Sequence, residues 1–183
     1  MKNPPDNAHQ AILAQWQEQE AAVRGRVSGR GVIPSDLLAQ RPGVELMQAI
    51  IGGALPVPPI ARSLDFVLVE VEHGRAVFQG TPTFDFYNPI GSVHGGWIAT
   101  LLDSCVGCAV HAALPAGKGY TTLELKVNYV RALTQDSGPV RAEGRIIHVG
   151  GRVATAEGRI TDPSGRLYAH CSTTCLIFDL AKK

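Results

Sequence analysis

Hydrophobic and polar residues alternate in six short runs between Leu64 and Leu180, a pattern typical of half-buried β-strands. The first two runs, LDFVLVEV and RAVFQGTP, flank the turn His73-Gly74, and this arrangement predicts a β-hairpin. The other four are separated by turn-forming Gly, Asp, Ser and Pro residues; they are TTLELKVNYVRA, PVRAEGRIIHV, RVATAEGRITD and LYAHCSTTCLIFDL. We therefore expect six strands.

Between the second and third runs lies WIATLLDSCVGCAVHAAL, which is apolar or small on nearly every side of a helix and is broken chiefly by Asp103 and His111. A helix of this composition is a buried one. It needs a sheet to cover it, and the economical arrangement is an antiparallel sheet curled around the helix. The expected fold class is α+β, with an antiparallel six-stranded sheet wrapped around one long central helix.

The amino-terminal segment follows a different, helical period. Residues 8–24 and residues 35–50 have apolar positions at helical spacing, and a Ser-Asp start signal opens the second segment. A glycine-rich connector separates them, and prolines follow the second segment. We expect a helical extension over residues 1–55 and the main domain over residues 56–183.

Composition narrows the class of protein. The chain has 183 residues, of which 18% are charged and 45% hydrophobic, with a net charge of +1. These values differ from those of disordered tails and polybasic nucleic-acid binders, so we expect no nucleic-acid partner. The first residues lack the features of a signal peptide, and no apolar run approaches the length that crosses a bilayer. We expect a cytoplasmic protein without a membrane partner.

The four cysteines form two close pairs, Cys105 with Cys108 and Cys171 with Cys175. A zinc site is geometrically conceivable, but the first pair lies in the apolar helix and the second in a strand. Cysteine is among the most buried residue types, so packing is the preferred interpretation. We expect free thiols in a reducing compartment and no metal.

The entrance and the middle of the apolar helix carry candidate chemistry. The paired glycines Gly95 and Gly96 stand where backbone N–H groups have no partner within the helix, so either can form an oxyanion hole. Asp103 is a carboxylate inside the apolar stretch, where burial without partners is costly. It is either a functional acid or a structural group that bonds a neighbouring strand or faces solvent.

Spacing indicates how these groups combine. Gly95 and Asp103 lie eight positions apart, which is about 12 Å along one helix, so they cannot reach one carbonyl within one chain. Two helices placed antiparallel across a two-fold axis would bring the glycine of one copy to the aspartate of the other. The pattern favours an active site at a homo-oligomer interface.

Three blocks in this order carry a family resemblance: N-x-I-G-x-x-H-G-G-x(6)-D, then K-V-N-Y-V-R, then G-G-R-V-A-T-A-E-G-R-I. Together they resemble the PaaI-like, phenylacetate-pathway branch of the hotdog-fold acyl-CoA thioesterases over about residues 64–178. The resemblance implies hydrolysis of an acyl-CoA thioester to free acid and CoA. It also implies no cofactor beyond the coenzyme A of the substrate, and a dimer or a dimer of dimers.

The resemblance also implies roles for residues in the first block. It assigns the main-chain N–H of Gly95 to the thioester carbonyl, with Asn88 and His94 at the same helix entrance. It makes Asp103 of the partner chain the nucleophile or the general base, and Thr122 the hydroxyl that orients water. For His94, holding the loop is preferred to a direct contact with the thioester.

Candidate substrate contacts are less specific. Basic side chains suit the phosphates of coenzyme A, although each is more often a solvated surface charge, and an aromatic residue near the glycines can line an acyl pocket or belong to the core. The candidates are Gly96, Thr121, Arg131, Arg152, Lys118 and Trp97.

Two other functions fit parts of the pattern. A hotdog dehydratase or hydratase would bind the same kind of ligand, but its Asp-x5-His pattern is absent because His111 follows Asp103 by eight positions. A non-catalytic acyl-CoA-binding module would tolerate the loss of Asp103. The acid in an apolar helix therefore favours the thioesterase.

Overall fold

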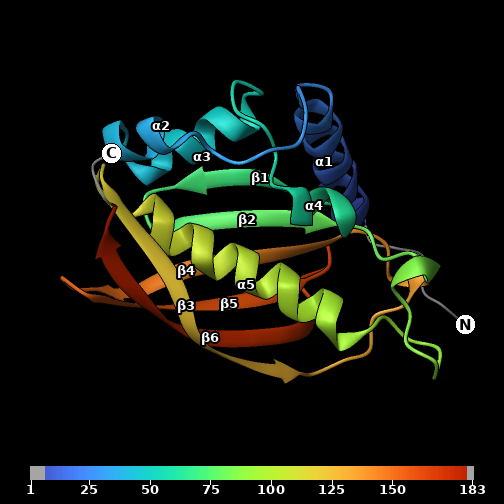
Figure 1. The fold of residues 1–183 in the computed structure, drawn as a ribbon. Helices are drawn as coiled ribbons and strands as arrows, with labels where there is room; N and C mark the ends of the chain where they lie inside the picture. Colours follow the sequence, from blue (N-terminus) through green and yellow to red (C-terminus); the bar gives the residue numbers. More distant parts are fainter. Residues whose placement is uncertain (1–6, 181–183) are drawn as a thin grey trace, which may run out of the picture.

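In the computed structural model, which describes residues 7–180, a six-stranded antiparallel sheet curves around one long helix (Figure 1). The strand order is β1-β2-β4-β5-β6-β3. The strands are β1 (Phe66–Glu72), β2 (Arg75–Gly80), β3 (Lys118–Tyr129), β4 (Val140–Val149), β5 (Val153–Thr161) and β6 (Leu167–Asp179). The hotdog fold expected from the sequence is confirmed.

The central helix α5 (Gly95–Ala112) lies against the concave face of the sheet. Gly144 of β4 and Gly158 of β5 are register partners beneath it. A Cβ atom at Gly144 would collide with the carbonyl oxygen of Cys105, and one at Gly158 would lie 2.8 Å from Val106 Cγ1. These two glycines therefore let the helix backbone approach the sheet closely, and this fixes where the side chains of α5 point.

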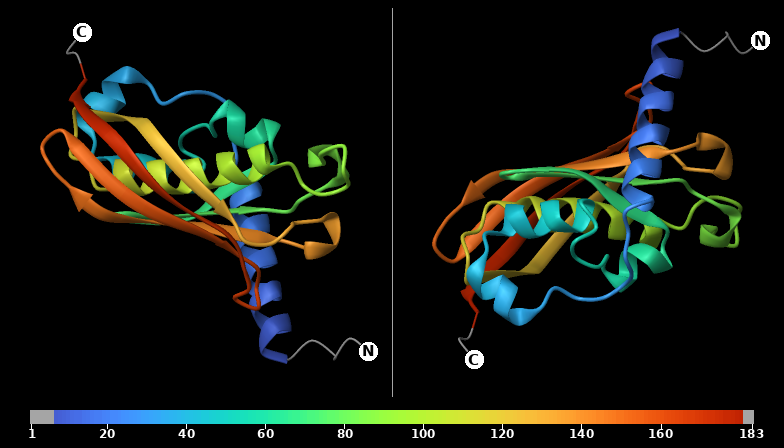
Figure 2. Two further views of the ribbon diagram at one scale, coloured as in Figure 1. Left: turned by 90° about the horizontal axis from the view of Figure 1, so that it is seen from below. Right: turned by 90° about the horizontal axis from the view of Figure 1, so that it is seen from above.

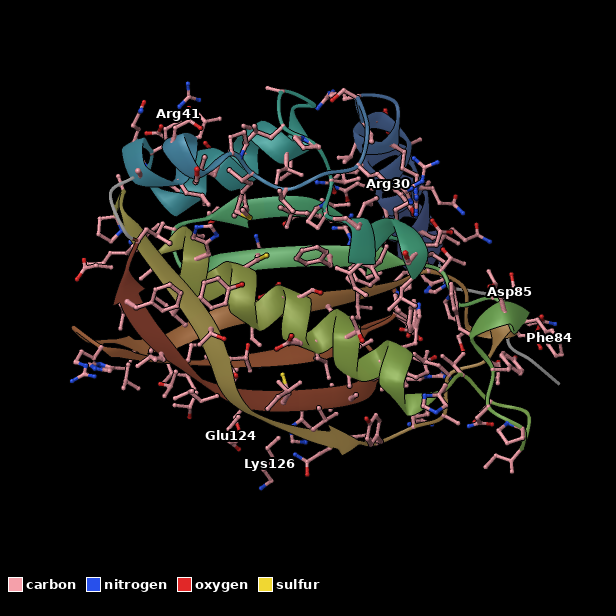
Figure 3. The ribbon with its side chains drawn as sticks, in the orientation of Figure 1. Arg30, Arg41, Phe84, Asp85, Glu124 and Lys126 are labelled. Carbon is pink, nitrogen blue, oxygen red and sulfur yellow. The ribbon has the colours of Figure 1, made fainter. Side chains whose placement is uncertain are left out.

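Strand β3 forms one edge of the sheet and, among the described residues, pairs only with β6. Its register shifts between Thr122 and Glu124, so Leu123 is the extra residue of a bulge. Glu124 and Lys126 point away from the helix (Figure 3). Leu123 and Tyr129 are 60% and 55% exposed, so this long edge presents apolar side chains together with free backbone groups.

The amino-terminal helices cover the sheet on two sides (Figure 2). Helix α1 (Asn7–Arg24) crosses the convex face, where Gln19 Nε2 donates to Val69 O at 3.1 Å. Helix α3 (Gly43–Ile51) packs against β1 and α5.

The prediction of a single helix over residues 35–50 is wrong, because the structure has α2 (Ser35–Gln40) and α3 as separate helices. Arg41 is extended, with φ −122° and ψ 142°. Pro42 lacks an N–H and disfavours helical geometry in the residue before it, which explains the break. A short helix that the sequence reasoning missed, α4 (Pro59–Ser63), follows with a proline at its start.

The predicted division near residue 55 stays a prediction, and residues 1–6 and 181–183 of its two parts lie outside the described residues. Within residues 7–180, no helix is long and apolar enough to span a membrane.

Candidate active site

The entrance of α5 leaves one glycine N–H available. His94 caps the helix, and its Nδ1 accepts a hydrogen bond from the N–H of Gly96 at 2.8 Å. The N–H of Trp97 donates to His94 O at 3.0 Å. Within residues 7–180, the structure records no acceptor for the N–H of Gly95. The N–H of Gly95 is therefore the available donor at this helix tip. The His94 ring is used as the N-cap and holds the first turn of α5 in place.

A cavity of about 530 Å³ opens at this helix tip, and we call it the entrance cavity. It is lined by residues 92–96, Ile98 and residues 129–133, so that Gly95 and Arg131 share it. Tyr129 Oη donates to the carbonyl oxygen of Gly95 at 3.0 Å. Sequence reasoning missed Tyr129, although this residue stands in the K-V-N-Y-V-R block.

Asn88 organises the loop before the helix and does not line the entrance cavity. Its Oδ1 accepts from the N–H groups of Ile90 and Ser92 at 3.1 and 3.2 Å, and its Nδ2 donates to Ser92 Oγ at 2.9 Å. The loop is also tied down by the N–H of His94, which donates to Phe86 O at 2.7 Å. In this protomer Asn88 therefore acts on the position of the helix tip.

Asp103 and Thr122 meet within one chain. The Thr122 hydroxyl donates to Asp103 Oδ1 at 3.1 Å, which joins the middle of α5 to β3 beside the bulge. This is the one hydrogen bond that the structure records for the Asp103 carboxylate within residues 7–180. Thr121 is exposed, as expected for the neighbouring position of a strand. The carboxylate therefore keeps room for a further donor.

The groups around Asp103 are held in their neutral forms. Burial, reinforced by the Asp103 carboxylate, raises the pKa of Cys108 to about 12. Burial, with Cys108 and Asp103 also contributing, raises the pKa of Tyr120 well above its usual value. Burial lowers the pKa of His111. The Cys108 thiol therefore stays protonated at neutral pH and is a poor nucleophile. All four cysteines are free, as predicted.

The predicted basic contacts do not gather at one place. Arg131 lies at the entrance cavity. Lys118 Nζ pairs with Asp179 Oδ1 at 2.7 Å, and Arg152 O accepts from the N–H of Ile177 at 2.8 Å. Ile177 is the register partner of Tyr120, so Lys118 and Arg152 lie toward the other end of the sheet.

Trp97 belongs to the core and does not line the entrance cavity. Its side chain is 3% exposed, its Nε1 donates to Leu64 O at 2.9 Å, and its ring stacks on Phe86 at 5.7 Å between centroids. The indole thus satisfies its polar atom inside the fold.

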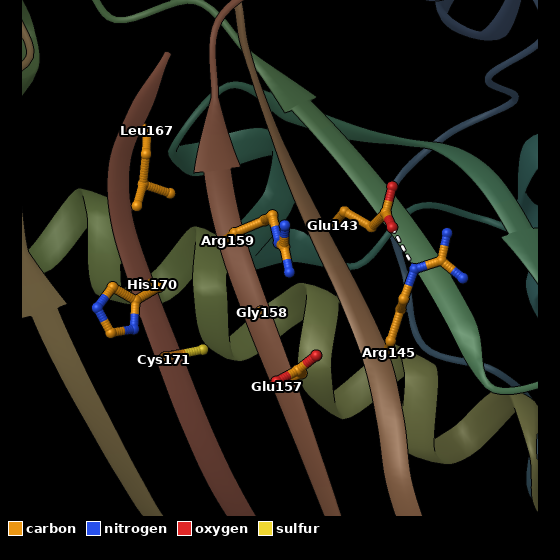
Figure 4. Close-up of a pocket in the computed structure, with 8 residues that line it drawn as sticks. All are labelled: Glu143, Arg145, Glu157, Gly158, Arg159, Leu167, His170 and Cys171. Atoms are coloured by element: carbon orange, nitrogen blue, oxygen red, sulfur yellow. Dashed lines mark hydrogen bonds and ion pairs between the residues drawn. The ribbon is translucent and has the colours of Figure 1, made fainter. Parts of the chain in front are cut away.

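A second hollow, of about 280 Å³, lies on the face of the sheet away from α5 (Figure 4). Acidic and basic side chains alternate in it, with Glu143 and Arg145 on β4, Glu157 and Arg159 on β5, and His170 beside them on β6. Arg145 Nε bonds to Glu143 Oε1. Among the described residues, no cluster of His, Cys, Asp or Glu could hold a metal ion.

Comparison with known proteins gives the class. A family model of the thioesterase superfamily matches residues 90–169. A protein of Saccharolobus solfataricus named "Putative esterase" is 31% identical over 110 residues, which cover 60% of this chain and 76% of that protein. The 1,4-dihydroxy-2-naphthoyl-CoA hydrolase of Listeria monocytogenes is 26% identical over 118 residues, covering 64% of this chain and 93% of that enzyme.

Among solved structures, a phenylacetic acid degradation-related protein from Ralstonia eutropha JMP134 superposes with a TM-score of 0.65 at 29% identity. The match covers 71% of this chain and 98% of that one. Fold and relatives together define a hotdog thioester hydrolase. The chain belongs to the thioesterase superfamily, and its structural neighbours include PaaI-like proteins, as the motifs predicted.

Proposed function

We propose that the protein hydrolyses acyl-CoA thioesters at a site shared by two protomers. In each site, the N–H of Gly95 from one protomer binds the thioester carbonyl oxygen, and Asp103 of the other protomer acts on the carbonyl carbon. The PaaI-like neighbours and the naphthoyl-CoA hydrolase relative support the choice of an acyl-CoA substrate.

The observation that carries this proposal concerns two groups, the Gly95 N–H and the Asp103 carboxylate. Each has hydrogen-bonding capacity left, and the two lie too far apart in one chain to act on one carbonyl group. The Gly95 N–H has no recorded acceptor within residues 7–180, and Asp103 has one recorded partner. Eight positions of helix separate them by about 12 Å, whereas an oxyanion donor must lie about 3 Å from its oxygen. A second copy is the economical way to bring them together.

Strand β3 is the surface that suits this second copy. Tyr129 bonds to Gly95 and Thr122 bonds to Asp103, so β3 runs alongside its own α5 in the opposite direction. Antiparallel pairing of two β3 edges across a two-fold axis would therefore set the two α5 helices antiparallel as well. It would also satisfy the free backbone groups of the edge and cover Leu123.

The chemistry needs an ionised carboxylate beside the carbonyl carbon. Asp103 either attacks the carbon directly or takes a proton from a water molecule that the Thr122 hydroxyl helps to hold. In the first route the C–S bond breaks as an acyl–Asp103 anhydride forms and coenzyme A leaves, and a water molecule then hydrolyses the anhydride. In the second route the C–S bond breaks after the activated water has added to the carbonyl carbon. Both routes consume one water molecule and give the free acid and the thiol of coenzyme A, which takes up a proton. Arg131 in the entrance cavity is the basic group we assign to the coenzyme A phosphates.

The first test is hydrolysis of a panel of acyl-CoAs, with the released thiol measured by a thiol reagent. We expect Asp103→Asn to lower turnover by at least about a hundredfold, because it removes the charge and keeps the shape. Asp36→Asn, at an exposed acid in α2, is the matched control and should equal the wild type. Unchanged turnover in folded Asp103→Asn protein would contradict the mechanism.

The second test separates a shared site from a site within one chain. Gly95→Pro removes the N–H at the first position of α5, where proline is tolerated, and His94 already has the extended ψ of 134° that proline requires. We expect a loss of about a hundredfold, while Gly95→Ala, which places a similar Cβ near Tyr129 but keeps the N–H, retains most activity.

Mixing the two inactive variants completes this test. A mixed dimer of Asp103→Asn and Gly95→Pro protomers contains one intact site in the shared arrangement. Random mixing should therefore restore about a quarter of wild-type activity, since half the dimers are mixed and each has one working site of two. Activity that stays at the level of the separate variants would place both groups in one chain.

A further inference from the structure

A third cavity, of about 210 Å³, lies between the segment before β1 and α5, and we call it the extension cavity. The segment before β1 supplies much of its wall, including Ile33, Met47, Ile50 and Val57. None of the residues that line it is Lys, Arg, Asp or Glu. The cavity therefore suits an uncharged, apolar group.

The extension cavity adjoins the Asp103–Thr122 pair through one shared wall. Tyr120 lines the cavity and stands two positions before Thr122 on β3, so both side chains point to the same face. On α5, Asp103, Gly107 and His111 follow one another at four-residue intervals and share a helix face.

Tyr120 fits against that helix face because of Gly107. A Cβ atom at Gly107 would lie 2.7 Å from Tyr120 Oη. The Tyr120 ring also packs against the His111 ring, with 5.6 Å between centroids. The cavity therefore begins one residue layer beyond the Asp103–Thr122 pair, on the side away from the entrance of α5.

We propose that the extension cavity receives the acyl group of the substrate, alongside the Tyr120 ring, and that the amino-terminal segment closes it. This inference rests on the proposed function, because it places the thioester carbon at Asp103. An apolar cavity of about 150 Å³ can hold benzene. The extension cavity therefore fits one substituted aromatic ring or an alkyl chain of similar volume.

The two cavities divide the substrate by its chemistry. The entrance cavity contains Arg131 and suits the charged coenzyme A end. The extension cavity has no charged lining residue and suits the acyl end. In the shared site, the entrance cavity of one protomer would meet Asp103 of the other. The thioester would therefore lie between the entrance cavity of the first protomer and the extension cavity of the second.

The test compares two valines of the segment before β1. Val57 lines the extension cavity, whereas Val32 is 79% exposed and lies outside it. We expect Val57→Phe to lower kcat/KM at least about tenfold for the largest acyl group that the wild type hydrolyses well, and to leave acetyl-CoA within about twofold. Val32→Phe should match the wild type throughout the acyl series.

Enlarging the cavity should act in the opposite direction. Ile33→Ala removes a lining side chain, and we expect the preferred acyl group to become larger, with Val32→Ala as the control. An acyl-size profile that is the same in Val57→Phe, Ile33→Ala and the two controls would overturn the assignment.

Binding of the free acids octanoate and phenylacetate, measured by calorimetry, separates this inference from the proposed function. We expect Val57→Phe to weaken binding at least about tenfold. If Asp103→Asn abolishes hydrolysis but Val57→Phe changes neither the size profile nor acid binding, the cavity assignment fails alone. If the wild type hydrolyses no acyl-CoA yet Val57→Phe weakens acid binding, the proposed function fails alone.

Discussion

The two faces of the sheet treat charged side chains in opposite ways. On the convex face, under α1, every guanidinium nitrogen of Arg141 has a hydrogen-bond partner in its own chain. Nε donates to Gln79 Oε1 at 2.8 Å, Nη1 to Glu70 Oε1 at 2.9 Å and Nη2 to Gln19 Oε1 at 2.7 Å. The guanidinium also lies 4.4 Å from the centre of the Trp16 ring. This network joins α1 to the sheet.

On the concave face, Asp103 has one recorded partner, Thr122, among the described residues. Arg141 is buried and Asp103 is half-buried, so both polar groups lose hydration on folding. A charge whose hydrogen-bonding sites are filled by its own chain stabilises the fold. A charge that keeps an open site beside neutral side chains is available to a substrate.

Among the substitutions that test this comparison, the largest change in stability is expected at Arg141. Arg141→Met keeps the aliphatic stem and removes the charge, so that Gln79 Oε1 and Gln19 Oε1 lose the donor that they have in the wild type. We expect the free energy of unfolding to fall by about 3 kcal/mol, near the low end for breaking a buried pair, because Arg75 still pairs with Glu70 at 2.8 Å. Denaturant unfolding measures this change.

Arg145→Met is the matched control on the same face. Arg145 pairs with Glu143, but its side chain is 57% exposed, so its removal should change the free energy of unfolding by less than about 1 kcal/mol. Folded Arg141→Met protein should keep wild-type kcat/KM. Lost activity at full folding would mean that the convex network also serves the site.

A smaller effect is expected at Thr122 on the concave face. Thr122→Val preserves the side-chain shape and removes the hydroxyl bonded to Asp103. We expect kcat/KM to fall about tenfold, while the free energy of unfolding changes by less than about 1 kcal/mol.

Thr122→Ser keeps the hydroxyl and should recover most of that activity. Steady-state kinetics with one acyl-CoA compares the variants. Equal rates for Thr122→Val and the wild type would contradict the catalytic role proposed for Thr122 and leave it a structural role.

Local pattern predicted most elements of this fold; it failed at Pro42 for a local reason and elsewhere where the outcome depended on tertiary packing. Alternation gave the six strands, and the apolar stretch gave α5, because both periods are imposed by burial. The break at Pro42 was visible in the sequence, but the apolar spacing on both sides outweighed it.

The site shows the same division. The glycines at the helix entrance and the acid in the apolar helix could be identified from residue type alone. Alternation along β3 would also have placed Tyr120 on the face of Thr122. The core position of Trp97 depends on its contacts with Leu64 and Phe86, and the cavity beside Ile33 depends on how the segment before β1 packs against the domain, so neither could be predicted from local pattern.

A third group, the carboxylate of Asp162 in the turn between β5 and β6, tests the comparison with the smallest effect. Its Oδ1 accepts from the N–H groups of Ser164 and Arg166 at 2.9 and 3.1 Å, and Tyr168 Oη donates to its Oδ2 at 3.2 Å. Burial alone would raise its pKa, but the hydrogen bond that Ser164 Oγ donates to Oδ1 at 2.6 Å, together with these other bonds, outweighs burial and lowers the pKa below the usual value. Asp162 therefore resembles Arg141, because hydrogen bonds from its own chain occupy both carboxylate oxygens.

Because the pKa of Asp162 is lower in the folded protein than in the unfolded chain, its ionised form stabilises the fold above the unfolded value of about 3.9. This contribution is lost as the pH falls through the folded value. We expect Asp162→Asn to be less stable than the wild type by about 1 kcal/mol at neutral pH, and the gap to narrow as the pH falls below about 4. Denaturant unfolding across this pH range measures the gap, and kcat/KM at neutral pH should not change. A gap that stays constant with pH would mean that the charge of Asp162 contributes nothing and only its shape matters.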